Sequence, residues 1–230
     1  MQRQETAGAG SVPGRSNSLE LLEPLGLFAV TLGVGWALEH GALAGWLGAH
    51  AGVAFAALWL YAPILALQLR GRDLGAHGFT LRQSPGAWRA LALCLAVLVP
   101  YTPLLAAWMR LVDGRGLSPG LPAGFAALVM HQLLAVALPE EAFFRGYLQT
   151  RLDGVSPPWR IFRVEITAGI VISSVLFALA HFALRGDPRT LGVFFPGLLF
   201  GWLRRQSGSV LLPVLYHALC NVYLFAMVGG

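Results

Sequence analysis

The chain has 230 residues, of which 56% are apolar and only 12% are charged, and its mean hydropathy is +0.64. A soluble domain is about 25% charged. This composition therefore excludes an ordinary soluble globular protein and favours a polytopic α-helical membrane protein. All sixteen basic residues are arginines scattered between the apolar runs, so the net charge of +5 indicates membrane orientation and not a nucleic-acid partner.

Residues 1–20 are rich in Gly, Ser, Gln and Pro and offer no apolar surface to bury. This composition is typical of disorder, so we predict a disordered polar N-terminus. Residues 21–230 are predicted to form a single membrane domain.

Long apolar runs predict an all-α fold, a membrane helical bundle of about seven transmembrane helices. The expected spans are residues 24–47, 49–69, 88–109, 123–151, 166–184, 190–203 and 210–228. Pro100 and Pro103 predict a kink in the third span. The segment 153–163 is expected to be a polar loop, and His77, between the second and third spans, is expected to be solvated.

The fourth span is too long for a simple crossing. At about 1.5 Å per residue it exceeds a hydrocarbon core of about 30 Å, so it must tilt, break or project into water. Pro139 lies directly before two acidic residues and is the natural place for a break. Irregular backbone at that depth must line a cavity and not face lipid.

The arginines are unevenly distributed between the two sides that seven spans would define. Eleven fall on the side of the N-terminus and four on the other; the latter are Arg110, Arg115, Arg185 and Arg189. The positive-inside rule then predicts a cytoplasmic N-terminus. We expect an integral protein of a bacterial-type inner (cytoplasmic) membrane.

Three of the predicted spans carry polar residues that are costly inside a bilayer. The fourth contains Glu140, Glu141 and Arg145, the fifth contains His181, and the seventh contains His217 and Asn221. A charged group at mid-bilayer costs about 2.5–3.5 kcal/mol on insertion scales, so such groups indicate a functional site. Each alone could be an interhelical hydrogen bond, but together they favour one shared cavity.

The spacing of these residues assigns them different tasks. Glu141 and Arg145 are four residues apart on a helix and can form an ion pair, while Glu140 is rotated by about 100° and stays free. A glutamate in a dry pocket suits a general base that activates water, and His or Asn can stabilise an oxyanion. Two histidines, a glutamate and an asparagine could equally bind a divalent metal such as zinc.

The ordered set Glu140-Glu141-x-x-x-Arg145, Phe177-x-x-x-His181 and His217-x-x-x-Asn221 resembles the CAAX-protease and bacteriocin-processing (CPBP, or Abi) family of intramembrane endopeptidases. The resemblance covers about residues 123–228. It implies that Glu140 is the general base and His181 its water-positioning partner. It further implies that His217 and Asn221 stabilise the oxyanion, and that Glu141 and Arg145 support the site.

The family has been described both as metalloproteases and as glutamate proteases, so the cofactor is expected to be either none or one divalent metal. The expected partners are the lipid bilayer and a membrane-associated protein or peptide, cleaved in a C-terminal tail or leader. The alternative is a catalytically silent family member that acts as a membrane scaffold, immunity factor or small transporter.

Overall fold

The computed structural model describes residues 18–41, 45, 47–121, 123–161 and 164–228. Most of these residues are helical, which confirms the predicted helical membrane bundle. The predicted disordered N-terminus lies outside the described residues except for its last three positions. Residues 18–20 begin helix α1 and so correct the end of that segment.

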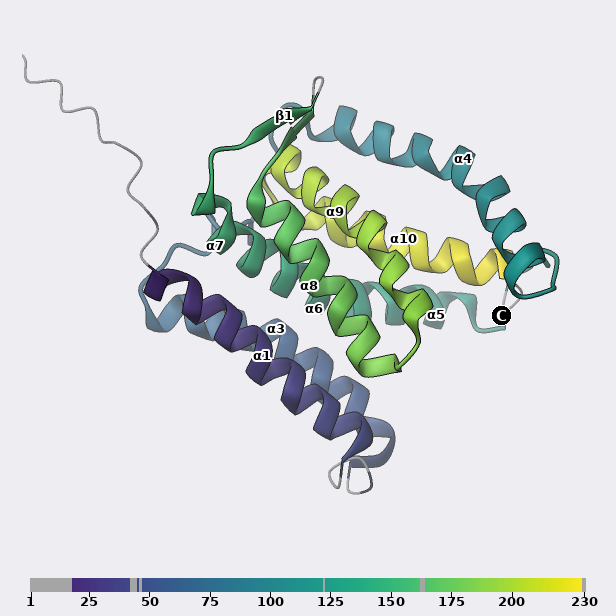
Figure 1. Cartoon of the computed structure of the whole chain (residues 1–230), viewed down its shortest axis with the longest axis horizontal. Coiled ribbons are helices and arrows are strands. Elements are labelled where there is room, and N and C mark those ends of the chain that lie inside the picture. Colours follow the sequence, from purple (N-terminus) through teal and green to yellow (C-terminus); the bar gives the residue numbers. More distant parts are fainter. Residues whose placement is uncertain (1–17, 42–44, 46, 122, 162–163, 229–230) are drawn as a thin grey trace, which may run out of the picture.

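The N-terminal half contributes three long helices: α1 (Ser18–His40), α3 (Ala51–Leu69), which follows the short 3-10 helix η1 (Gly48–His50), and α4 (Ala87–Val112). Helices α1 and α3 lie side by side as a hairpin. Helix α4 runs without interruption through Pro100 and Pro103 and is curved in Figure 1.

The fourth predicted span is one continuous helix of 31 residues, Phe125–Val155. It changes its winding along the way: α5 (Phe125–His131), π-helical η2 (Gln132–Ala137), α6 (Leu138–Glu141), π-helical η3 (Ala142–Gln149), α7 (Thr150–Leu152) and 3-10 η4 (Asp153–Val155).

The predicted break at Pro139 is therefore wrong, because the helix continues through it. In a regular α-helix the proline ring would collide with the carbonyl of Ala135. A π turn is wider than an α turn, and one ends at Ala137, two residues before the proline. The local widening accommodates the ring and keeps the helix intact.

The C-terminal half continues with α8 (Ala168–Arg185), the 3-10 helix η5 (Pro188–Val193), α9 (Phe194–Ser207) and α10 (Leu211–Val228). In the part of the chain that the structure describes, six helices are long and apolar enough to cross a membrane. The predicted sixth span is divided between η5 and α9. With 14 residues, α9 is too short to count among the six.

The predicted polar loop 153–163 is only partly a loop. After η4 the chain forms a two-stranded antiparallel hairpin of β1 (Trp159–Ile161) and β2 (Val164–Ile166), in which Arg160 is opposite Glu165. The hairpin leads directly into α8, whose first turn is capped by the Thr167 hydroxyl accepting the Ile170 amide.

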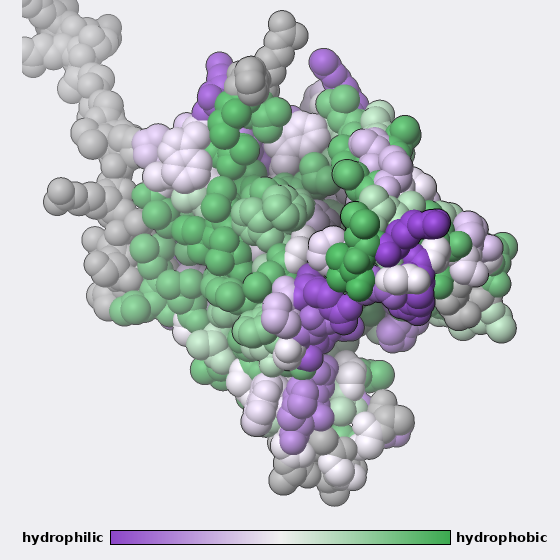
Figure 2. Space-filling model, turned by 45° about the vertical axis from the view of Figure 1, so that its right-hand side comes forward, coloured by the Kyte–Doolittle hydropathy of each residue, from purple (hydrophilic) through white to green (hydrophobic). Residues whose placement is uncertain are grey.

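The helices alternate in direction, so their ends gather at two sides of the molecule (Figure 1). One side holds the start of α1, the end of α3, the start of α4, the hairpin and the junction between α9 and α10. Backbone bonds from Ser84 to Ser207 and from Val210 to Gly78 connect the loop 70–86 to that junction. The surface between the two sides is largely apolar (Figure 2), as a membrane-embedded protein requires.

His77, predicted to be solvated, is instead buried, with 7% of its surface exposed. The loop around it packs closely against the guanidinium of Arg204, which donates to the Ala76 carbonyl. Gly78 adopts a φ of +83°, and a Cβ there would lie 2.4 Å from Arg204 Nε. Only glycine fits both the backbone and the space.

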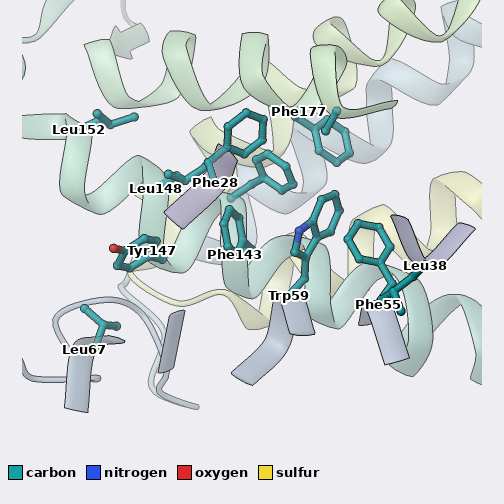
Figure 3. Close-up of a cluster of buried hydrophobic side chains, with 12 residues drawn as sticks. Phe28, Leu38, Phe55, Trp59, Leu67, Phe143, Tyr147, Leu148, Leu152 and Phe177 are labelled. Atoms are coloured by element: carbon teal, nitrogen blue, oxygen red, sulfur yellow. The ribbon is translucent and has the colours of Figure 1, made fainter. Parts of the chain in front are cut away.

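Helix η3 lies at the centre of the bundle, and all eight of its residues are buried. Aromatic rings surround it (Figure 3). The ring of Trp59 in α3 stacks on Phe143, with 5.7 Å between the ring centres, and meets Phe144 edge-on, with 5.1 Å between the ring centres. The ring of Phe28 in α1 contacts both phenylalanines. The first two long helices therefore form an apolar wall behind the segment that carries Arg145.

Candidate active site

The site begins with an ion pair in the centre of the bundle. Arg145 Nη1 lies 3.0 Å from Glu141 Oε1, and both side chains are completely buried. Arg145 Nη2 donates to the backbone carbonyl of Gly197 at 3.2 Å. The guanidinium carbon also lies 4.5 Å from the ring centre of Phe177 and 5.2 Å from that of Phe200. The predicted pair forms, and aromatic faces help to compensate for the lost hydration of the cation.

His217 of α10 contacts the same glutamate. Its Nδ1 lies 2.9 Å from Glu141 Oε1. An ionised carboxylate can only accept, so the imidazole Nδ1 carries the hydrogen and donates it. The ring is stacked on Phe200 at 4.6 Å and meets the edge of Phe177 at 6.0 Å. Glu141 and the two phenylalanines thus fix the orientation of His217 and direct its Nε2 away from the ion pair.

Glu140 faces that second imidazole nitrogen. Its Oε2 lies 3.7 Å from His217 Nε2, which is too long for a direct hydrogen bond. This oxygen is buried and has no hydrogen-bond partner among the described residues, although the side chain as a whole is 14% exposed. Buried oxygens of this kind nearly always have a partner. A bound water or a substrate group would supply it.

His181 of α8 lies on the other side of Phe177. Its Nδ1 is 3.0 Å from the Phe177 carbonyl, and its ring meets the edge of the Phe177 ring at 4.4 Å. Among the described residues it forms no hydrogen bond or ion pair with Glu140 or His217. One phenylalanine ring therefore contacts both histidines, and the Nε2 of His181 stays available.

Asn221 follows His217 by one turn of α10. Its Nδ2 donates to Oε1 of Gln132 at 2.9 Å, which joins α10 to the first residue of η2. Gln132 is 6% exposed. An amide nitrogen has two hydrogens, so one remains after this contact. The sequence contains one further signal here that we did not use: Gln132 is a polar residue in an apolar helix, eight positions before Glu140.

A second row of contacts runs beside the ion pair. Arg145 and Gln149 are four residues apart in η3, and they donate to the carbonyls of Gly197 and Gly201, four residues apart in α9. A Cβ on Gly201 would lie 3.0 Å from Gln149 Oε1 and 3.1 Å from the side chain of Ile170. The two glycines bring α9 close enough for these bonds to form.

In the positions that the structure describes, the side chains of the candidate site are not arranged as a metal site. Within the described ranges, no three His, Cys, Asp or Glu side chains are grouped so that they could hold an ion. The Nδ1 of each histidine is already used by Glu141 or by a backbone carbonyl.

Part of the chain matches a known protein family. Residues 122–223 match the family model described as Type II CAAX prenyl endopeptidase Rce1-like. The match supports a CAAX-protease (CPBP) family for this segment. It includes every residue of the candidate site, from Gln132 to Asn221. No curated protein and no solved structure matches the chain.

The match supports a CAAX-type intramembrane protease at the level of the family. The helices that precede residue 122 lie outside the match, yet α1 and α3 pack directly against the segment that carries Arg145.

Proposed function

We propose that this chain is an intramembrane endopeptidase that hydrolyses a peptide bond with Glu140 as general base. The proposal rests on one observation: the two adjacent acids have different hydrogen-bond partners. Glu141 is occupied by Arg145 and His217, whereas Glu140 keeps a buried, unpartnered oxygen 3.7 Å from the imidazole. A free carboxylate in a partly dry pocket is the arrangement that general-base catalysis requires.

In this mechanism a water molecule occupies the space between Glu140 and His217. Glu140 takes a proton from this water, and at the same time the water oxygen attacks the carbonyl carbon of the scissile bond. The same proton then passes from the Glu140 carboxyl group to the nitrogen of the departing amine. The C–N bond breaks, the second water proton stays on the new hydroxyl group, and the products are a carboxylic acid and a free amine.

The negative oxygen that forms during attack needs hydrogen-bond donors. Asn221 has one amide hydrogen left beside its bond to Gln132, and a doubly protonated His217 would donate from Nε2. We assign His181 to positioning the water through its free Nε2.

The substrate class follows from the location of the site. Glu140 and His217 lie within helices that are apolar enough to cross a membrane, so the substrate is a membrane-associated protein or peptide. Cleavage in a C-terminal tail or a leader segment suits an enzyme that receives its substrate from the bilayer.

Glu140→Gln tests the proposal, because it removes the base and keeps the shape. Membranes carrying wild type or Glu140→Gln should be compared by mass spectrometry for a protein tail that is shortened only by the wild type. Glu39→Gln is a matched control, since it makes the same change at an exposed position near the end of α1. We expect loss of cleavage in Glu140→Gln alone, with an unchanged melting temperature.

Retention of the biological phenotype by folded Glu140→Gln would instead support a catalytically silent scaffold, immunity factor or transporter.

We also propose that the hairpin side of the molecule is cytoplasmic. Eight described arginines lie on that side, and four lie on the opposite side, at positions 110, 115, 185 and 189. The eight are Arg70, Arg72, Arg82, Arg89, Arg151, Arg160, Arg204 and Arg205. By the positive-inside rule this difference sets the orientation. Single cysteines at Arg82 and Arg115 should then react with an impermeant maleimide from opposite sides of the membrane.

A further inference from the structure

The hairpin of β1 and β2 has one wholly apolar face. Facing residues of an antiparallel pair lie on the same side of the sheet, as do residues two positions apart. The pairs Trp159–Ile166 and Ile161–Val164 therefore share one face. Three of these side chains are largely exposed: Trp159 by 49%, Ile161 by 53% and Val164 by 39%.

The opposite face is polar and attached to the bundle. It carries Arg160 and Glu165, and Glu165 forms an ion pair with Arg205 near the end of α9. The strands make their main backbone contacts with each other and not with a helix. The apolar face lies opposite this attachment, and among the described elements each strand has its main contacts with the other strand.

Neither water nor the hydrocarbon core suits such a hairpin. An isolated two-stranded hairpin is marginally stable in water, and three large apolar side chains would be exposed there. In hydrocarbon, the free edges of both strands would leave backbone N–H and C=O groups without partners. The boundary region of the bilayer, where apolar side chains reach acyl chains and the backbone stays hydrated, satisfies both needs.

The position of the hairpin along the bundle places it at that boundary. Ile166 is separated by one residue from Ala168, where the membrane-crossing helix α8 begins. Trp88 at the start of α4 is on the same side of the molecule and is 65% exposed. Tryptophan is enriched at membrane–water interfaces. Trp159 and Trp88 are thus placed where a bilayer interface would pass.

We propose that the β1–β2 hairpin is an interfacial membrane anchor, whose apolar face inserts between lipid headgroups and acyl chains beside α8. Its occupant is the lipid of the surrounding bilayer. The hairpin thereby fixes the depth of the N-terminal end of α8 in the bilayer. The same helix carries His181 near its other end. This assignment does not depend on the proposed chemistry, because it concerns lipid contact alone.

The test compares neighbouring residues on opposite faces. In full-length protein with Cys94→Ala and Cys220→Ala, a single cysteine replaces either Ile161 or Arg160 and is labelled with a polarity-sensitive fluorophore. The protein is reconstituted in phosphatidylcholine vesicles with or without doxyl-labelled lipid. We expect lipid-borne doxyl groups to quench the probe at position 161 more than that at 160. Aqueous iodide should show the reverse order.

Equal quenching of both probes by iodide would overturn the proposal, since the apolar face would then be in water. Protection of the probe at 161 from both quenchers would also overturn it, because protein and not lipid would cover the face. Val164→Cys replaces Ile161→Cys if the latter folds poorly, because the two residues pair on the same face.

Discussion

The carboxylate of Glu141 accepts a hydrogen bond from Nδ1 of His217 over 2.9 Å, so a residue on the central helix orients an imidazole on α10. The same oxygen is 3.0 Å from Arg145. Glu141 is therefore a shared acceptor for a cation and an imidazole, and its side chain is completely buried. Its neighbour Glu140 lies 3.7 Å from His217 and forms no hydrogen bond with either group, so the two adjacent acids should respond very differently to the same substitution.

Glu141→Gln is expected to destabilise the protein as well as inactivate it. The change leaves the buried Arg145 cation uncompensated, and breaking a buried pair costs about 3–5 kcal/mol. Thermal unfolding in detergent should show a large drop in melting temperature for Glu141→Gln and little change for Glu140→Gln. Equal melting temperatures for the two variants would contradict the assigned roles.

A double variant separates stability from activity. Replacing a buried ion pair by apolar residues of similar size is often neutral. Arg145→Leu alone should therefore give a poor yield of folded protein, whereas Arg145→Leu with Glu141→Leu should recover much of the folding. Cleavage should remain absent in the double variant, because His217 has lost its acceptor Glu141.

Gln132→Leu is expected to lower kcat with little effect on KM. The bond between Gln132 and Asn221 holds the amide that we assign to the oxyanion, and a hydrogen bond of this kind contributes about 0.5–1.5 kcal/mol. This range corresponds to roughly a twofold to tenfold loss in kcat. Gln132→Glu retains an acceptor and should recover part of the rate. A change in melting temperature without a change in kcat would show a purely structural role.

Gly201→Ala is expected to weaken the packing of α9 against the central helix. The added methyl group would lie 3.0 Å from Gln149 Oε1 and 3.1 Å from Ile170, and overpacking of this kind costs about 1–3 kcal/mol. Gly26→Ala in α1 is the control, since a Cβ there meets nothing within 4 Å. Thermal unfolding should separate the two variants. Equal melting temperatures of the two variants would mean that α9 can shift away from the central helix with no loss of stability.

The stability of the protein should fall in mild acid because of His77. Burial lowers the pKa of His77 below its ordinary value of 6.5, and nearby arginines act in the same direction, against a bond to the Asp73 carbonyl. As the pH falls, His77 is therefore protonated at a higher pH in the unfolded chain than in the folded protein. Stability is complete above about pH 6.5 and is lost as the pH drops through the lowered pKa.

His77→Gln keeps a donor for that carbonyl but cannot titrate. The melting temperature of the wild type should fall more between about pH 7.5 and about pH 5 than that of His77→Gln. Parallel curves for the two proteins would assign the acid sensitivity to other groups.

Hydropathy predicted the membrane bundle and the positions of most helices, because burial in lipid is a property of long segments. The ion pair of Glu141 and Arg145 followed from helical spacing, which survives the π turns on either side of α6. The association of His217 with Glu141 could not be predicted in the same way. It depends on how α10 packs against α6, and a span-by-span analysis does not contain that packing.

Local rules failed where tertiary packing decided the outcome. Pro139 is a helix breaker by its chemistry, yet the wide turn before it keeps the helix whole. His77 lies in a polar loop, yet that loop is folded against Arg204. The hairpin at Trp159 was missed because each strand has only three residues, too few to give a periodic pattern.

The aromatic wall formed by α1 and α3 has a consequence for how the chain can be divided. Phe143 and Phe144 lie against Trp59 and Phe28. They directly precede Arg145, which bonds to both Glu141 and the Gly197 carbonyl. The recognisable protease segment is thus not a self-contained unit. Without α1 and α3, the rings of Phe143 and Phe144 would face lipid, and the Arg145 cation behind them would lose this cover.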